Sequence, residues 1–193
     1  DPWVLGVWLG DGRANRGMIC GHVDDAQPGE ACGRAGYEIS LTQTQGDVRY
    51  FTVRGLRTQL RLAGLLDNKH VPAAYLRASE AQRFAILRGL MDTDATCTKT
   101  GECRFTNRNR SLAAAVHELA TGLGLRAGFR EISVAGAPHY VVGFKAAADR
   151  SAFSIERKAD RQREKIDTRA AARYVRSVKP AASVPVRCIE VNS

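Results

Sequence analysis

The chain has 193 residues, a formal net charge of +9 at pH 7 and a sequence pI of about 9.7. Hydrophobic residues make up 44 % of it, enough for a core in one domain or two small fused units. This positive surplus favours nucleic acid over membrane as partner, although charge alone decides little. No apolar run approaches the roughly 20 residues needed to span a bilayer, and no signal peptide opens the chain. We therefore expect a prokaryotic cytoplasmic, nucleoid-associated protein without membrane contact and, because the chain begins at Asp1, a piece of a longer one.

The first half of the chain predicts helices at both ends and strands between them. Asp1 followed by proline is typical of a helix N-cap, and the helix should end near the glycines at 10 and 12. Beyond it we expect a strand interrupted by a long glycine-rich loop at 13–36, a strand at 37–43, and a helix at 48–66 that closes at Gly64.

The second half repeats this order. Ser79 and Gln82 predict a capping box at the start of a helix. The expected later elements are a hairpin turning at Thr100-Gly101, a helix capped by Ser111, a hairpin at 130–145, a charged helix at 156–173 and a strand in the last ten residues. Because helix, strands and helix recur with an offset of 83 residues, and Gly64-Leu65 matches Gly124-Leu125, the pattern indicates a pseudo-dimer made by fusion.

The five cysteines form no C-x-x-C motif, which argues against a structural zinc site. Cys97 and Cys103 could face each other across a hairpin. Cys20, His22 and Cys32 lie in one glycine-rich stretch where a metal clip is conceivable. Reduced thiols in a cytoplasmic protein are the simpler interpretation.

Two short segments carry the functional signal. Residues 4–12 read VLGVWLGDG and residues 87–95 read LRGLMDTDA, each an apolar helix with a glycine five residues before an aspartate. Small residues four apart lie on one helix face and allow close helix packing. Such packing would bring Asp11 and Asp94 together, and two adjacent carboxylates repel each other unless a cation lies between them. A turn-capping role explains either aspartate alone, but both in matching context indicate a metal site.

These two segments resemble the paired motifs of the LAGLIDADG homing endonucleases. The stretch between them, NKHVPAAYLRASEAQRFAILRGLMDTD, resembles the intein-embedded branch of that family, and the terminal VPVRCIEV resembles the strand at which a splicing domain resumes. The resemblance implies a monomeric, saddle-shaped α/β (α+β) protein with two pseudo-twofold-related subdomains, each a curved antiparallel sheet with helices. We expect the subdomains at 1–78 and 79–178, and a linker remnant at 179–193.

The resemblance also implies an activity: Mg²⁺-dependent, site-specific cleavage of both strands of DNA at a long recognition site. Asp11 and Asp94 match the catalytic acids that bind metal, with Gly10 and Thr93 as further ligands. Two or more Mg²⁺ ions would be shared by the carboxylates, and Mn²⁺ could substitute. Lys69 matches a catalytic lysine, and Lys158, with Lys165 as rival, matches its partner. These lysines would polarise water or offset phosphate charge, and a solvated surface role stays open for each.

The remaining expectations concern DNA contacts and departures from the family. Candidate DNA-binding residues are Arg13, Arg16, Gln43, Lys99, Arg104, Asn107 and Lys145, with phosphate or solvent as alternative contacts for most of them. Ala95 replaces the usual glycine after the second acid. If that position needs a left-handed backbone, alanine costs roughly 1 kcal/mol and could weaken cleavage. A decayed module that binds DNA without cutting it, and a purely structural insert, are therefore the alternatives. Residue 1 is not a nucleophile and the chain has no terminal His-Asn pair, so we expect no self-splicing.

Overall fold

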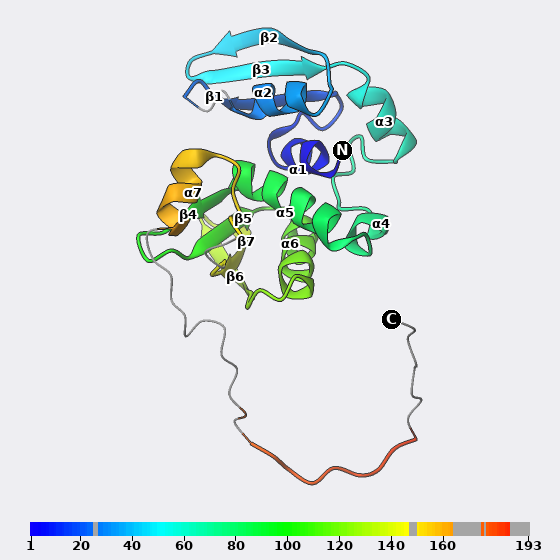
Figure 1. Cartoon of the computed structure of the whole chain (residues 1–193), viewed down its shortest axis with the longest axis vertical. Helices are drawn as coiled ribbons and strands as arrows, with labels where there is room; N and C mark the ends of the chain where they lie inside the picture. The colour runs from blue at the N-terminus through cyan, green and yellow to red at the C-terminus, as the bar shows by residue number, and fades with distance from the viewer. Residues whose placement is uncertain (25–26, 147–149, 164–174, 176, 186–193) are drawn as a thin grey trace.

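The computed structural model describes residues 1–24, 27–146, 150–163, 175 and 177–185. Two antiparallel sheets flank a central pair of helices (Figure 1). The elements are α1 (Pro2–Asp11), β1 (Met18–His22), α2 (Gln27–Arg34), β2 (Ile39–Gln45), β3 (Val48–Val53), α3 (Leu56–Leu62), α4 (Ala73–Leu76), α5 (Glu80–Asp94), β4 (Ala95–Cys97), β5 (Cys103–Asn107), α6 (Arg110–Gly122), β6 (Gly128–Val134), β7 (Ala137–Phe144) and α7 (Glu156–Arg163).

The central helices α1 and α5 begin with the caps that the sequence predicts. The Asp1 carboxylate accepts a hydrogen bond from the Val4 backbone N–H at 3.0 Å. Ser79 and Gln82 form the complete capping box of α5. These caps satisfy helix N–H groups that have no intrahelical partner, so each helix has a fixed start and its length sets where the terminal aspartate lies.

Helices α1 and α5 pack against each other more extensively than any other pair of elements. At their crossing, a Cβ added to Gly6 would lie 2.4 Å from the Ile86 carbonyl oxygen and 3.0 Å from Gly89 Cα. A Cβ added to Gly89 would lie 2.3 Å from the Trp3 carbonyl oxygen. The two backbones therefore touch through glycines on both sides, and a methyl group on either would push the helices apart.

Each sheet contains an equivalent unit, a central strand followed by a helix. The first has strand order β1-β3-β2 and the second β4-β5-β7-β6. Two residues separate β3 from α3, and two separate β5 from α6. The helices close alike: Leu65 N–H donates to Leu60 O and Leu125 N–H to Ala120 O, both at 2.9 Å, after glycines with positive φ. The expected correspondence of Gly64-Leu65 and Gly124-Leu125 is confirmed.

The halves differ around this shared unit. Between β1 and β3 the first half inserts α2 and β2, whereas β4 and β5 are joined by a short turn at Thr98–Gly101. The neighbour of β3 in the first sheet is β2, whereas the neighbour of β5 in the second sheet is β7. In the second half α6 is followed by β6 and β7, whereas no strand lies between α3 and α5 in the first half. The subdomain boundaries at residues 78 and 178 stay predictions, although all strands of the first sheet precede residue 79 and all of the second follow it.

Three sequence-based elements need correction. Residues 48–53 form strand β3 and not the first turns of a helix, because Val48, Tyr50 and Thr52 pair with β1 and β2. The loop expected within 13–36 contains α2. The helix expected to be capped by Ser111 begins two residues earlier, since Asn109 is its N-cap and its side chain accepts from the N–H groups of Ser111 and Leu112. The end of the charged helix beyond residue 163 and most of the terminal strand lie outside the described residues.

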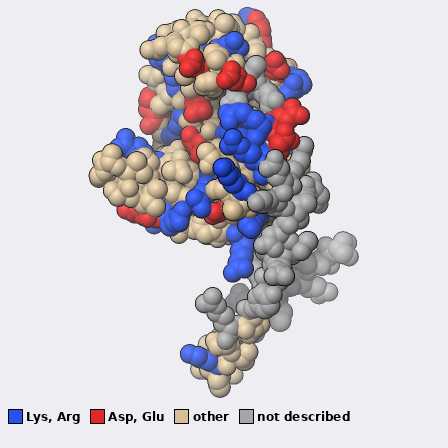
Figure 2. All heavy atoms as spheres, turned by 90° about the vertical axis from the view of Figure 1, so that its left-hand side faces the viewer, with Lys and Arg blue, Asp and Glu red and all other residues tan. Residues whose placement is uncertain are grey.

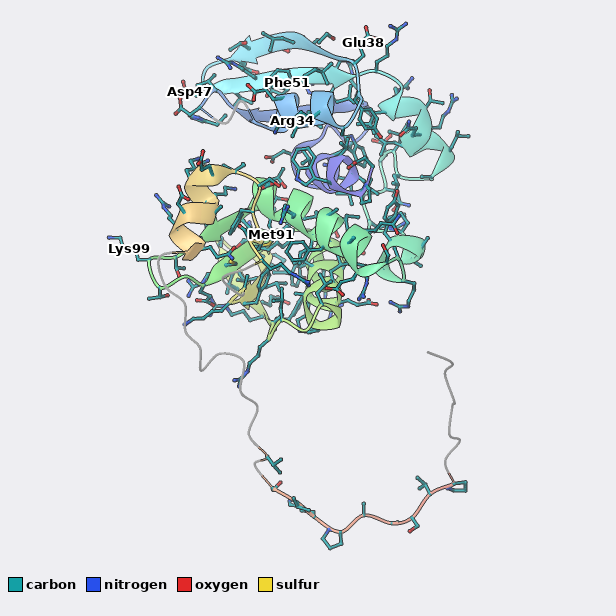
Figure 3. All side chains as sticks on the ribbon, in the orientation of Figure 1. Arg34, Glu38, Asp47, Phe51, Met91 and Lys99 are labelled. Atoms are coloured by element: carbon teal, nitrogen blue, oxygen red, sulfur yellow. The ribbon has the colours of Figure 1, made fainter. Side chains whose placement is uncertain are left out.

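The core is continuous across both halves. It contains the inner faces of α1 and α5, the buried faces of α3 and α6, and the inward residues of both sheets. Met91 on α5 is fully buried in the second half, whereas Phe51 on β3 packs against the core from the first sheet (Figure 3). Because both sheets are anchored to one helix pair, a change at the crossing affects both at once.

We predict that Gly6→Ala lowers the free energy of unfolding by about 3 kcal/mol, because the new methyl group meets a backbone carbonyl that cannot rotate away. Gly33→Ala is the matched control: its Cβ meets nothing within 4 Å, and alanine favours a helix such as α2. Urea unfolding followed by circular dichroism measures both. Equal stability of Gly6→Ala and wild type would show that the helices are not in backbone contact.

Candidate active site

Asp11 and Asp94 are the last residues of α1 and α5, at the same end of the helix pair. A Cβ added to Gly10, the residue before Asp11, would lie 1.9 Å from Thr93 Oγ1 and 3.3 Å from Asp94 Oδ2. Close packing therefore continues from Gly6 to the ends of the helices. This packing brings the two aspartates close together, as the glycine spacing predicts.

The two carboxylates share a poorly hydrated, mutually repulsive environment. Burial raises the pKa of Asp11 from its usual 3.8 to about 6, with repulsion from Asp94 adding to the rise and Lys158 and Lys69 opposing it. Burial also raises the pKa of Asp94, opposed by a hydrogen bond from Asn107 and by the two lysines. Each carboxylate thus favours a proton or another positive charge beside it.

Lys69 and Lys158 occupy matching positions at the ends of the two helices. Lys69 Nζ donates to Gly10 O at 3.1 Å and to Gly12 O at 2.7 Å, at the end of α1. Lys158 Nζ donates to Asp92 O at 2.6 Å and is also 3.4 Å from Thr93 O, at the end of α5. Both ammonium groups thus face the negative ends of helix dipoles. Burial lowers the pKa of Lys69, which the two aspartates partly offset.

Lys158 is not a surface lysine, since only 8 % of the residue is exposed. The rival candidate, Lys165, lies outside the described residues. The catalytic roles of both Lys69 and Lys158 stay predictions, but their placement near the two acids agrees with them.

Asn107 has a place in the site that the sequence did not reveal. Its side-chain amide donates to Asp94 Oδ2 at 2.7 Å, and its own Oδ1 accepts from the Asn109 N–H at 2.7 Å. It had been expected to contact DNA, and this pair of bonds orients it toward Asp94. Only the pairing of β4 with β5, which the hairpin pattern predicts, could have hinted at this contact.

Asp92 is a second residue whose position the sequence left unexplained. It is 3 % exposed. One carboxylate oxygen accepts from Trp3 Nε1 at 2.9 Å, and the other accepts from the N–H groups of Ser154 and Ile155 at 2.7 and 3.1 Å. Asp92 therefore ties α1 and α5 to the segment that leads into α7, the helix that carries Lys158. The matching position in α1 is Leu9, which is fully buried.

The backbone conformation of Ala95 is not the left-handed one considered from the sequence, so alanine causes no strain there. Ala95 has φ −122° and ψ 157°, an extended conformation that any residue adopts, and Gly12 is likewise extended at φ −77° and ψ 154°. Glycine at 12 is required for space instead, since its Cβ would lie 2.3 Å from Trp8 Cδ1. Alanine at 95 is therefore compatible with an undistorted Asp94.

The donor set fits a hard divalent cation. The described residues contain no cluster of three or more His, Cys, Asp or Glu side chains able to hold a metal. The two carboxylates supply oxygen donors only. Burial raises both pKa values, and repulsion from Asp94 adds to the rise for Asp11, a repulsion that a cation would relieve. The carbonyls of Gly10 and Thr93, the further ligands expected from the sequence, accept hydrogen bonds from Lys69 and Lys158. Mg²⁺ suits such a site because it prefers oxygen ligands and keeps several waters.

The cysteines do not form the metal clip considered from the sequence. Cys20 Sγ donates to the Asp11 carbonyl oxygen at 2.8 Å, and Cys32 is a buried free thiol. Cys97 and Cys103 are directly opposite each other on β4 and β5, as the hairpin pattern predicted, and both are free.

The exposed faces of the two sheets carry several of the predicted DNA-binding residues. Arg13 lies 4.9 Å over the Tyr50 ring, and Gln43 pairs with Tyr50 on β3. Arg104 lies on β5 between the buried Cys103 and Phe105, and thus on the opposite face. The others are Lys99 at the tip of the β4–β5 hairpin (Figure 3), Arg16 in the loop before β1, and Lys145 directly after β7.

One face of the molecule carries a cluster of basic side chains (Figure 2). Figure 2 views the side on which α7 lies, and Lys and Arg residues cluster near its middle with Asp and Glu around them. This clustering agrees with an anionic partner, because a local surplus of one charge attracts its opposite over several ångströms.

The fold is that of the LAGLIDADG homing endonucleases. A structure of I-DmoI in complex with DNA and Ca matches with a TM-score of 0.56 and 15 % identity, over 82 % of this chain and 94 % of that one. I-DmoI with DNA and Mn matches with a TM-score of 0.53 and 16 % identity, over 74 % and 87 % of the two chains. Mesophilic variants of the homing endonuclease I-DmoI match with a TM-score of 0.54 and 17 % identity, over 77 % and 83 %.

A sequence relative gives a different kind of information. The chain is 36 % identical over 200 residues to a replicative DNA helicase DnaB of Mycobacterium intracellulare. The match covers all of this chain but only 32 % of the helicase, so the chain spans about a third of its relative's length. No protein-family profile matches the chain. No helix within the described ranges is long and apolar enough to cross a membrane.

We predict that Asp11→Asn stabilises the metal-free protein at pH 8 by about 1 kcal/mol, a rise in Tm of roughly 2–4 °C. The folded pKa of Asp11 is raised, so its ionised form destabilises the fold above about pH 6 and this penalty fades as the pH falls toward 3.8. Thermal unfolding in EDTA should therefore show the gain at pH 8 and little of it at pH 4. Glu131→Gln, an exposed carboxylate on β6, is the control, and an Asp11→Asn gain that does not depend on pH would contradict the argument.

Proposed function

We propose that the chain is a divalent-metal-dependent endonuclease that cuts both strands of DNA at a specific site. The observation that carries the proposal is the pair of partly buried carboxylates at the joined ends of α1 and α5, with a lysine at each helix end. Their raised pKa values, the exposed sheet faces on either side and the fold shared with DNA-bound I-DmoI all support it.

The site residues would have different roles in phosphodiester hydrolysis. Asp11 and Asp94 would hold Mg²⁺ or Mn²⁺, together with the carbonyls of Gly10 and Thr93; the bound metal would supply an activated water and stabilise the leaving oxygen. Lys69 and Lys158 place positive charge beside the acids and can offset charge that develops on the phosphate. Asn107 holds the Asp94 carboxylate in one orientation, so that acid is preorganised before DNA binds.

The relative indicates where the chain would occur. A helicase that contains an endonuclease fold over about a third of its length is what an intein inserted in a host protein would produce. We therefore propose that the chain acts as a monomer, natively lies within an intein of a DnaB-type helicase, and works in a prokaryotic cytoplasm. Its DNA target would then be the helicase gene that lacks the insertion.

We predict that the wild-type chain with Mg²⁺ makes one double-strand cut in a DnaB-type helicase gene that lacks the whole intein, splicing segments included. The same gene with the intein present should stay intact, because the insertion separates the two halves of the target. Gel analysis of linear products tests this directly. Asp11→Asn and Asp94→Asn should each abolish cutting while binding measured by mobility shift stays within a few-fold of wild type, as Asn keeps the size of the side chain. Loss of binding together with cutting would assign both residues a structural role.

The decayed alternative, a protein that binds DNA without cutting it, rested on strain at Ala95 that the structure does not show. We predict that Ala95→Gly leaves the cleavage rate within about three-fold of wild type, because the backbone there is extended and alanine fits it. Single-turnover cleavage at saturating protein measures this rate. A wild-type chain that binds the target but cuts only after Ala95→Gly would favour the decayed module instead.

A further inference from the structure

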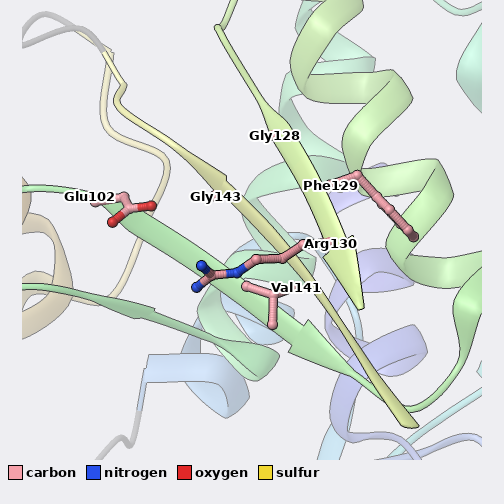
Figure 4. A pocket seen from close by; sticks show the side chains of 6 residues that line it. All are labelled: Glu102, Gly128, Phe129, Arg130, Val141 and Gly143. Atoms are coloured by element: carbon pink, nitrogen blue, oxygen red, sulfur yellow. The ribbon is translucent and has the colours of Figure 1, made fainter. Parts of the chain in front are cut away.

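The exposed face of the second sheet contains a hollow of about 190 Å³ that takes no part in the site above. Its lining includes Glu102 directly before β5, Gly128 and Arg130 on β6, and Val141 and Gly143 on β7, the strand between β5 and β6. In Figure 4 the Glu102 and Arg130 side chains point toward each other over β7. A carboxylate and a guanidinium thus face one shallow depression from opposite sides.

Glycines form the floor of this hollow for a steric reason. Gly128 and Gly143 are cross-strand partners on β6 and β7. A Cβ added to Gly143 would lie 2.7 Å from Glu102 Oε1, closer than any side-chain carbon normally approaches. Glycine at 143 therefore allows the Glu102 carboxylate to extend over β7, and leaves room for a flat group to approach the backbone.

Some polar atoms of the hollow are held in place by hydrogen bonds within the protein, and others have no hydrogen-bond partner in the described residues. Arg104 donates to Glu102 Oε2 from Nε at 2.9 Å and from its terminal nitrogen at 2.6 Å, which fixes the carboxylate. Within the described part of the chain, no hydrogen bond or ion pair reaches Glu102 Oε1 or the exposed Arg130 guanidinium. The hollow therefore presents an acceptor and a group of donors side by side.

This pattern is complementary to one base pair in the major groove of DNA. Guanine offers the acceptors N7 and O6 and cytosine offers the N4 amino donor, and arginine and carboxylate side chains are the usual partners of these groups. We propose that Arg130 and Glu102 read a G·C base pair, with Arg130 on guanine and Glu102 on cytosine N4. This assignment rests on the proposed function, since it requires that the sheet face binds DNA.

The charges of the hollow exclude the main rivals. A phosphate would be attracted by Arg130 but repelled by Glu102 on the other side of the floor. An A·T pair would bring the thymine O4 acceptor toward the carboxylate, and a reversed C·G pair would bring guanine O6 and N7 toward it. A T·A pair would offer O4 to Arg130 and the adenine N6 amino group to Glu102, but only guanine gives Arg130 two acceptors, so G·C in this orientation is the best match.

The test is selection of bound sequences from a randomised double-stranded DNA library in EDTA, where binding is read without cleavage. The wild-type chain should select G·C at one position within its site. Arg130→Ala should reduce discrimination at that position by about 5- to 150-fold and leave the other positions unchanged. Arg130→Gln should weaken the preference for guanine without creating one for A·T, because Glu102 remains and would face the thymine O4 acceptor.

Two further variants address Glu102 and its support. Glu102→Gln and Gly143→Ala should both weaken discrimination at the same base pair, the second because its methyl group displaces the carboxylate. Arg61→Ala, an exposed arginine on α3, is the matched control and should change no position. Circular dichroism confirms that each variant is folded, and any unfolded one is replaced by Arg130→Lys, which keeps the charge but loses the bidentate contact.

The possible failures are distinguishable. If the wild-type chain selects no sequence at all, the proposed function fails and the base-pair assignment fails with it. If a site is selected but Arg130→Ala weakens all sequences equally, Arg130 contacts phosphate and the assignment alone is overturned. A site whose preferences are unchanged by every variant of the hollow also overturns it.

Discussion

The contact between Gly6 and Gly89 determines where everything else in the molecule lies. With no side chain between them, α1 and α5 cross at backbone distance, and the remaining turns of each helix carry Asp11 and Asp94 to one place. The same contact anchors both sheets, because each is packed on one of these helices. A partly buried pair of acids would normally be unfavourable, and Lys69 and Lys158 at the two helix ends offset part of that cost.

The two halves achieve the same arrangement by different means. In the second half Asp92 connects α5 to the segment before α7, and that helix delivers Lys158. In the first half Leu9 is buried in the core, and Lys69 comes from the connection between α3 and α4. The Asp94 carboxylate is oriented by Asn107, whereas no hydrogen bond to the Asp11 carboxylate occurs among the described residues. The approximate symmetry of the backbone therefore does not extend to the environment of the two acids.

Much of this could be predicted from the sequence because it depends on local pattern. The glycine spacing, the caps at Asp1 and Ser79, and the two hairpins of the second half are set by residues close together in the chain. The helix predicted over 48–66 was wrong in its first part because alternation in a short strand such as β3 is hard to distinguish from helical spacing. Asn107 and Asp92 could not be assigned, since their partners lie on other elements. The roles of the predicted site residues stay predictions until they are measured.

The glycine crossing also sets a rule for recombination between proteins of this architecture. A half taken from another source can replace residues 79 onward only if it presents a glycine opposite Gly6 and a residue no larger than threonine opposite Gly10. Any bulkier graft would hold the two acids apart even if each half folded well by itself. Exchange of whole halves to create new chimeric specificities is therefore limited by two backbone positions, far from any surface that would be chosen for redesign.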